Sequence, residues 1–63
     1  MIKFTIMRKN EIVGTIYGTK FTTFGKDDNA QVEIYSKEGD LEVCLDFKAI
    51  EQDKKGNTYI YID

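Results

Sequence analysis

Apolar residues recur at every second position along much of this chain. In residues 2–6 the apolar side chains are separated by Lys3 and Thr5, and the same period returns in residues 30–35 and 58–62. Successive side chains of a strand point to opposite faces of a sheet, so this period is typical of strands with one buried face. The pattern therefore predicts a chain built from short strands.

The segment 40–55 carries signals of both a helix and a strand. Asp40 is a suitable helix N-cap, and Gly56 is a suitable C-terminal stop. The apolar residues of this segment are Leu41, Val43, Leu45, Phe47 and Ala49. They recur with period two, and on a helix they would scatter around the whole cylinder, so that no single face could be buried. We therefore expect one long strand over residues 41 to about 50, followed by a loop over residues 52–57.

Further strands are expected at residues 11–17 and 20–24, which makes about six in all. Gly14 lies inside the first of these and predicts a bulge or a close approach of another backbone. The segments 25–29 and 37–40 are rich in Gly, Asp and Lys, and the first also contains Asn. Gly and Asx residues suit tight turns, so both segments are expected to connect strands.

Tight turns cannot connect parallel neighbours, because a parallel crossover needs about a dozen residues or more. The sheet is therefore expected to be mostly antiparallel. With 63 residues, the chain has the size of a single small domain over residues 1–63. We expect an all-β fold of about six short antiparallel strands that form a small curled barrel or a bent meander, SH3-like or OB-like in size, with no substantial helix.

The chain contains no histidine, and Cys44 is its single cysteine. The commonest general base, the commonest metal ligand and ordinary zinc sites are thereby excluded. The glycines lack the spacing of a phosphate-binding loop, and residues 27–29 lack the spacing of an EF-hand. Glu42 and Asp46 would be about 13 Å apart on one strand, which is too far for a glycosidase pair. We expect a non-enzymatic protein that uses no cofactor and no metal.

Charge is divided unevenly along the chain. Residues 1–26 carry five basic residues and one acidic residue, a net charge of +4, whereas residues 27–63 carry four basic and ten acidic residues, a net charge of −6. Such a division predicts either separate basic and acidic patches, or strands of the two halves that interleave and mix their charges. We favour interleaving.

The apolar N-terminal stretch is broken by Lys3, Thr5 and Arg8. It therefore resembles neither the core of a signal peptide nor a membrane span. A secreted domain of this size usually carries several cysteines, and this chain has one. We expect a cytoplasmic protein with no membrane partner.

The last expected strand carries two tyrosines of the same parity, Tyr59 and Tyr61. Tyrosine is enriched in protein interfaces, and a last strand that is also an edge strand can pair with another chain. Our leading hypothesis is a protein-binding module that binds a larger protein partner or associates with itself. By analogy of size, it would be an accessory or inhibitory protein of phage or mobile-element type. The candidate interface residues are Tyr35, Glu42, Asp46, Tyr59 and Tyr61.

The alternative hypothesis is a β-barrel that binds single-stranded nucleic acid. Such surfaces combine rings that stack on bases with cations that contact phosphates, and the basic N-terminal half contains both. The candidate residues are Arg8, Lys9, Tyr17, Lys20, Phe21 and Phe24. Phe21 and Phe24 have opposite parity, so a regular strand cannot bury both, and a place in the core is the competing interpretation. The net charge of −2 is also unlike that of a dedicated DNA-binding protein.

Overall fold

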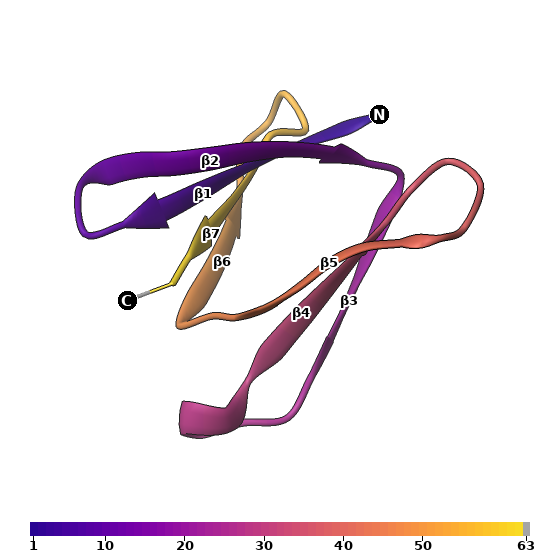
Figure 1. Ribbon diagram of the computed structural model, residues 1–63. Coiled ribbons are helices and arrows are strands. Elements are labelled where there is room, and N and C mark those ends of the chain that lie inside the picture. Colours follow the sequence, from indigo (N-terminus) through magenta and orange to yellow (C-terminus); the bar gives the residue numbers. More distant parts are fainter. Residues whose placement is uncertain (63) are drawn as a thin grey trace.

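The computed structural model describes residues 1–62 and consists of strands joined by short connections, one of which contains the 3-10 helix Asp27–Asn29 (Figure 1). The strands form a four-stranded sheet in the order β2-β1-β7-β6 and a three-stranded sheet in the order β3-β4-β5. The expected all-β fold is confirmed, and residues 1–62 contain no α-helix. The seven strands are β1 (Ile2–Arg8), β2 (Glu11–Gly18), β3 (Lys20–Phe24), β4 (Gln31–Tyr35), β5 (Leu41–Asp46), β6 (Ala49–Gln52) and β7 (Thr58–Tyr61).

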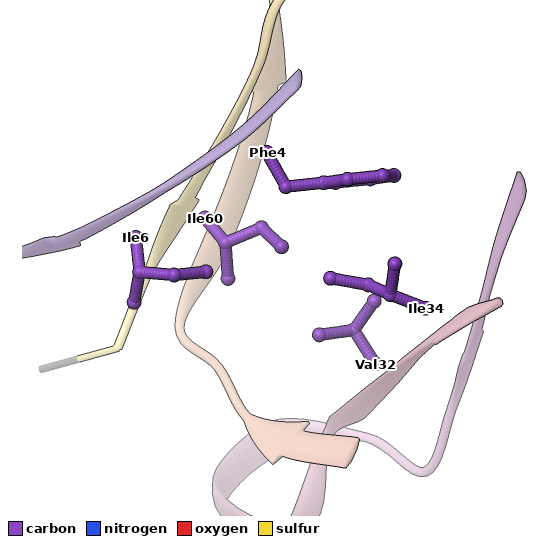
Figure 2. Packing of buried hydrophobic residues seen from close by; sticks show 5 residues of the cluster. All are labelled: Phe4, Ile6, Val32, Ile34 and Ile60. Carbon is purple, nitrogen blue, oxygen red and sulfur yellow. The ribbon is translucent and has the colours of Figure 1, made fainter. Parts of the chain in front are cut away.

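The core lies between the two sheets, which do not close into a barrel. Phe4, Ile6 and Ile60 point from the four-stranded sheet toward Val32 and Ile34 of the three-stranded sheet (Figure 2). All five side chains alternate with residues on the opposite face of their strands, as the period of two predicts. The partly buried residues packed around them are Ile2, Ile16, Phe21, Val43, Leu45, Phe47, Ile50 and Ile62.

Pairing between strands is antiparallel at every ladder except one. β1 and β7 are parallel neighbours, with Phe4 opposite Thr58 and Met7 opposite Tyr61. The expectation of a mostly antiparallel sheet is confirmed. The parallel pair arises because the crossover between its strands is the whole of β2 to β6, which is far longer than the minimum that a parallel pair needs. As a result, β7 lies inside the sheet between β1 and β6.

The single long strand expected over residues 41–50 is wrong, because the chain changes sheets within it. β5 pairs with β4 in one sheet, and β6 pairs with β7 in the other. The break falls between Asp46 and Ala49. The amide of Phe47 donates to the Ala30 carbonyl at 3.1 Å, beside the three-stranded sheet, and the amide of Lys48 donates to the Tyr61 carbonyl at 2.6 Å, in the four-stranded sheet. The expected alternation through Ala49 is also wrong, because Phe47 and Ile50 pack against the core whereas Ala49 is exposed.

Two glycines of β2 have different structural roles. Opposite Ile6 the partner is Gly14, but opposite Met7 it is Ile12, so one extra residue forms the bulge that Gly14 predicted. A β-carbon at Gly14 would lie 3.9 Å from the nearest Ile6 carbon, an ordinary contact. At Gly18 a β-carbon would lie only 2.7 Å from Ile34 Cγ2. Gly18 therefore permits the four-stranded sheet to approach β4 closely at the corner where the sheets meet.

Candidate functional site

One side of the four-stranded sheet faces away from the core, and we name it the tyrosine face. In a paired ladder, residues opposite each other point to the same side of the sheet. Thr5 is opposite both Thr15 and Tyr59, and Met7 is opposite both Ile12 and Tyr61. The register thus gathers side chains from all four strands on one surface. The tyrosine face consists of Lys3, Thr5, Met7, Ile12, Thr15, Tyr17, Ala49, Glu51, Tyr59 and Tyr61.

Apolar and hydroxyl-bearing side chains dominate the tyrosine face. Ile12 is 66% exposed and Tyr17 is 57% exposed, whereas Tyr59 and Tyr61 are half-buried. Thr5, at its centre, is only 5% exposed. Because longer side chains surround this small one on the neighbouring strands, they limit its access to water. The result is a broad surface in which aromatic area and hydroxyl groups lie together.

Charge on the tyrosine face is confined to Lys3 and Glu51, which belong to different strands. A hydrogen bond with Glu51, followed by desolvation and the Glu51 charge, raises the pKa of Tyr61 above its ordinary value. No hydrogen bond between side chains of residues 1–62 involves Tyr17 or Tyr59. Within the same range, the Tyr17 and Tyr59 hydroxyls also have no acidic hydrogen-bond partner and can bind an incoming group.

The three-stranded sheet also has an outer side, which we name the charged face. Tyr35 donates a hydrogen bond to Glu33 at 2.6 Å, and this bond is the main cause that raises the pKa of Tyr35. The ammonium of Lys20 lies 5.3 Å from the centre of the Tyr35 ring, within the range of a cation–π contact. The charged face consists of Lys20, Thr22, Phe24, Gln31, Glu33, Tyr35, Leu41, Cys44 and Asp46.

Polar groups of the charged face bind one another. Besides the Tyr35–Glu33 pair, the Gln31 amide donates to Asp46 at 2.9 Å. Cys44 is exposed between these pairs, opposite Glu33. A partner that covered this face would have to compete with bonds that already exist, since a buried polar group needs a hydrogen bond.

The five residues predicted to form a protein interface are divided between the two sheets. Tyr59 and Tyr61 lie on the tyrosine face, whereas Tyr35 and Asp46 lie on the charged face. Glu42 is the extra residue where the β4–β5 register shifts between Ile34 and Tyr35. The five therefore do not share one surface. The expectation that the last strand lies at an edge is wrong, because β7 has neighbours on both sides.

The residues proposed for nucleic-acid binding are also dispersed. Arg8 and Lys9 lie at the β1–β2 turn, and Tyr17 lies on the tyrosine face. Lys20 lies on the charged face with Phe24, which is 43% exposed. The sixth residue, Phe21, points into the core and contacts Phe4 edge to face, with ring centres 5.6 Å apart. Phe21 and Phe24 thus have opposite orientations, as their parity predicts, and no single stacking platform forms.

Sequence reasoning did not identify Thr5, Met7, Ile12 or Thr15 as members of a candidate surface. Each belongs to β1 or β2. Their neighbours Tyr59 and Tyr61 belong to β7, which is more than 40 residues away along the chain. One local signal existed: Ile12 and Val13 are consecutive apolar residues directly before Gly14, the residue that predicted a bulge. Such a pair indicates a residue that a bulge leaves on the outer side.

Residues 1–62 form no pocket and no group of three side chains suited to holding a metal ion. Within the same described part of the chain, no helix is long and apolar enough to cross a membrane. Comparison of the chain with protein-family models, with curated proteins and with solved structures gave no match.

Proposed function

We propose that this chain is a non-enzymatic protein-binding module whose tyrosine face covers part of the surface of a larger protein. The observation that carries the proposal is the composition of this face, which presents three tyrosines, Tyr17, Tyr59 and Tyr61, with two charged side chains in the whole set. The centres of protein interfaces are enriched in aromatic residues and depleted of charge. Tyrosines at such centres often contribute most of the binding energy.

Charge also favours a protein over nucleic acid as the ligand of this face. Lys3 is the one cation of the tyrosine face, and Glu51 cancels its charge. Nucleic-acid affinity depends on several contacts between cations and phosphates. A neutral protein surface with hydrogen-bonding groups matches the tyrosine face better. The inhibitory role proposed by analogy requires that the tyrosine face cover the active site or binding site of the partner.

The first test compares paired aromatic substitutions on the two faces. Tyr59→Ser with Tyr61→Ser removes two rings from the tyrosine face, and Phe24→Ser with Tyr35→Ser removes two from the charged face. Lysate proteins captured by the unaltered chain are identified, the purified partner is titrated against each variant, and circular dichroism checks the fold of each. We expect the first pair to weaken binding by about 100-fold or more and the second pair by about threefold or less.

Equal affinity of the two double variants for the partner, with both folded, would contradict the assignment to the tyrosine face. A labelled single-stranded oligonucleotide is titrated in parallel at low salt, where phosphate contacts are strongest. We expect no binding. Binding that weakens steeply as salt is added would instead support the nucleic-acid alternative.

A further inference from the structure

β2 is an edge strand that lacks the usual protection of an edge. It is the longest of the seven strands, and only β1 pairs with it. Edge strands are commonly protected by lysine, proline, inward charges, bulges or short length. The bulge of β2 lies near its start, so the residues from Gly14 onward have none of these devices. The other three edges follow this rule: Lys20 begins β3, Glu42 and Asp46 lie on β5, and β6 has four residues. β2 contains a single charged residue, Glu11, at its first position.

Exposed apolar side chains are concentrated on β2. The large hydrophobic residues that residues 1–62 expose number six, and three of them are Ile12, Val13 and Tyr17. Val13, at the bulge, is 48% exposed. Beyond the bulge, Gly14 to Gly18 pair with β1 in unbroken register. Gly18 is buried at the corner against β4, so the free edge is Gly14 to Tyr17, four residues of regular strand that span about 13 Å.

Positive charge lies at both ends of this free edge. Arg8 and Lys9 form the turn that leads into β2, and their charge exceeds that of Glu11, which is opposite Arg8. At the other end, Lys3 is opposite Tyr17, and Lys20 follows the end of β2 by two residues. A segment that pairs with the edge is therefore favoured if its ends are acidic.

We propose that the free edge of β2 binds an extended segment of a partner protein as a fifth strand of the four-stranded sheet, and that this segment has apolar residues at its centre and acidic residues at both ends. The inference rests on the proposed function, because the ligand is again a protein. It names the edge as a second contact beside the tyrosine face. Backbone hydrogen bonds supply affinity in such strand addition, and alternate side chains supply specificity.

A second copy of the chain fits this edge less well than an acidic segment. If two β2 strands paired antiparallel, the Arg8–Lys9 turn of one copy would approach Lys20 of the other. Like charges at both ends of the ladder oppose that pairing. The charge pattern thus selects the partner segment over self-association through β2.

The test begins with a displayed library of random nine-residue peptides selected against the folded protein. We expect enriched peptides with acidic ends and an alternating apolar centre. One of them is synthesised with a fluorescent label and titrated against the protein. In NMR spectra of the complex, amide exchange is expected to slow at alternate residues within 14–17, whose N–H groups point to the free side, and to remain unchanged in β6.

Matched charge variants then test the ends of the edge. Lys9→Glu with Lys20→Glu reverses one cation at each end, and we expect the peptide dissociation constant to rise about tenfold at low salt. The control, Lys54→Glu with Lys55→Glu, makes the same change of charge in the loop that follows β6, and less than a twofold effect is expected. Equal effects of the two pairs would overturn the proposal, as would selection of no peptide or of peptides without acidic ends.

The variant Tyr59→Ser with Tyr61→Ser separates this inference from the proposed function. It is expected to bind the peptide with unchanged affinity, because the edge is intact, while losing the protein partner. If this variant binds both the peptide and the partner with full affinity, the proposal for the β2 edge is supported and the proposal for the tyrosine face is wrong. Loss of peptide binding by this variant, with its fold intact, would show that the peptide occupies the face and would overturn the edge proposal.

Discussion

The tyrosine face and the charged face are the outer surfaces of two sheets that share one core. They differ in how many of their polar side chains have hydrogen-bond partners within the protein. On the charged face, Tyr35 is bonded to Glu33 and stacked under Lys20, and Gln31 is bonded to Asp46. On the tyrosine face, Tyr61 has one acidic neighbour, Glu51, whereas the Tyr17 ring is exposed and the Tyr59 ring is half-buried. Polar groups of the charged face already have hydrogen-bond partners within the protein. The tyrosine face would therefore contribute more binding free energy when a partner covers it.

This difference has a simple origin in the two sheets. The charged face lies over β3, β4 and β5, and each of these strands places one charged residue outward: Lys20, Glu33 and Asp46. The tyrosine face combines strands from both ends of the described chain, and their outward positions are mostly Thr, Tyr, Met and Ile. The halves of opposite charge therefore interleave at the level of strands, as favoured from the sequence. The two faces differ in charge by a small margin: two of the ten residues of the tyrosine face are charged, against three of the nine residues of the charged face.

The largest effect is expected from a substitution at the corner where the two sheets meet, because it would change the position of one face relative to the other. Gly18→Ala would place a β-carbon 2.7 Å from Ile34 Cγ2 and 2.8 Å from the Tyr35 carbonyl oxygen. We expect the free energy of unfolding to fall by about 1–3 kcal/mol. Urea denaturation followed by circular dichroism measures the change.

Gly14→Ala is the matched control for the corner. Its β-carbon has room, at 3.9 Å from Ile6, and alanine lowers the entropy of the unfolded chain, so stability is expected to rise by about 0.4–1 kcal/mol. If both substitutions cost the same stability, the close approach at Gly18 does not constrain the sheets.

A single charge placed on each face would sharpen the comparison. Thr15 and Thr22 are exposed threonines on the edge strands β2 and β3, one on each face. Thr15→Lys introduces an unpaired cation where a partner would exclude water, and we expect its affinity for the partner to fall about tenfold. Thr22→Lys, opposite Glu33, is expected to change affinity by less than about twofold.

Titration calorimetry with the purified partner measures both affinities. Thermal unfolding of the two variants should agree with that of the unaltered chain, because surface substitutions change stability little. If Thr22→Lys weakened binding more than Thr15→Lys, the binding surface would be the charged face of the three-stranded sheet.

The smallest expected effect concerns the two tyrosines that have acidic partners. Hydrogen bonds with Glu33 and Glu51 raise the pKa of Tyr35 and Tyr61, respectively, above the ordinary value near 10. A raised pKa of the folded state gives stability that is complete below the unfolded pKa and is lost as pH rises through the folded pKa. Stability is therefore expected to decline at alkaline pH.

Absorbance of the tyrosinate ion, followed as pH rises, tests this pairing. Glu33→Gln is expected to lower the pKa of Tyr35 alone, and Glu51→Gln to lower that of Tyr61 alone. Tyr35→Phe and Tyr61→Phe assign the two transitions. Four tyrosines that ionise together near the ordinary value in the unaltered chain would contradict both pairs.

Much of the fold was predictable because alternation is a local property. Phe4, Ile6, Val32, Ile34 and Ile60 lie in the core as their parity indicates. Alternation reports which side of a strand is buried, but not which sheet the strand joins. At the change of sheets near Phe47 the inward positions shift from odd-numbered to even-numbered residues. The alternation expected to continue through Ala49 was therefore wrong there, because Ile50 packs against the core and Ala49 is exposed.

The candidate site was predictable only in part for the same reason. The shared face of Tyr59 and Tyr61 follows from two positions of one strand, and it was predicted. Their neighbours Thr5 and Met7 depend on the parallel register of β1 and β7, which no local pattern indicates. The internal position of β7 was missed because a chain segment near the end of a sequence can still lie at the centre of a sheet.

The parallel pairing of β1 and β7 also has a consequence for synthesis of the protein. β1 leaves the ribosome first among the strands, but its parallel neighbour β7 leaves last. Until then, one side of β1 has unpaired backbone groups, and Phe4, Ile6 and Ile34 have no Ile60 to complete their packing. Contacts this distant along the chain form slowly. The nascent chain therefore carries an adhesive strand throughout its translation, and chaperones that hold extended apolar segments have their natural target in β1.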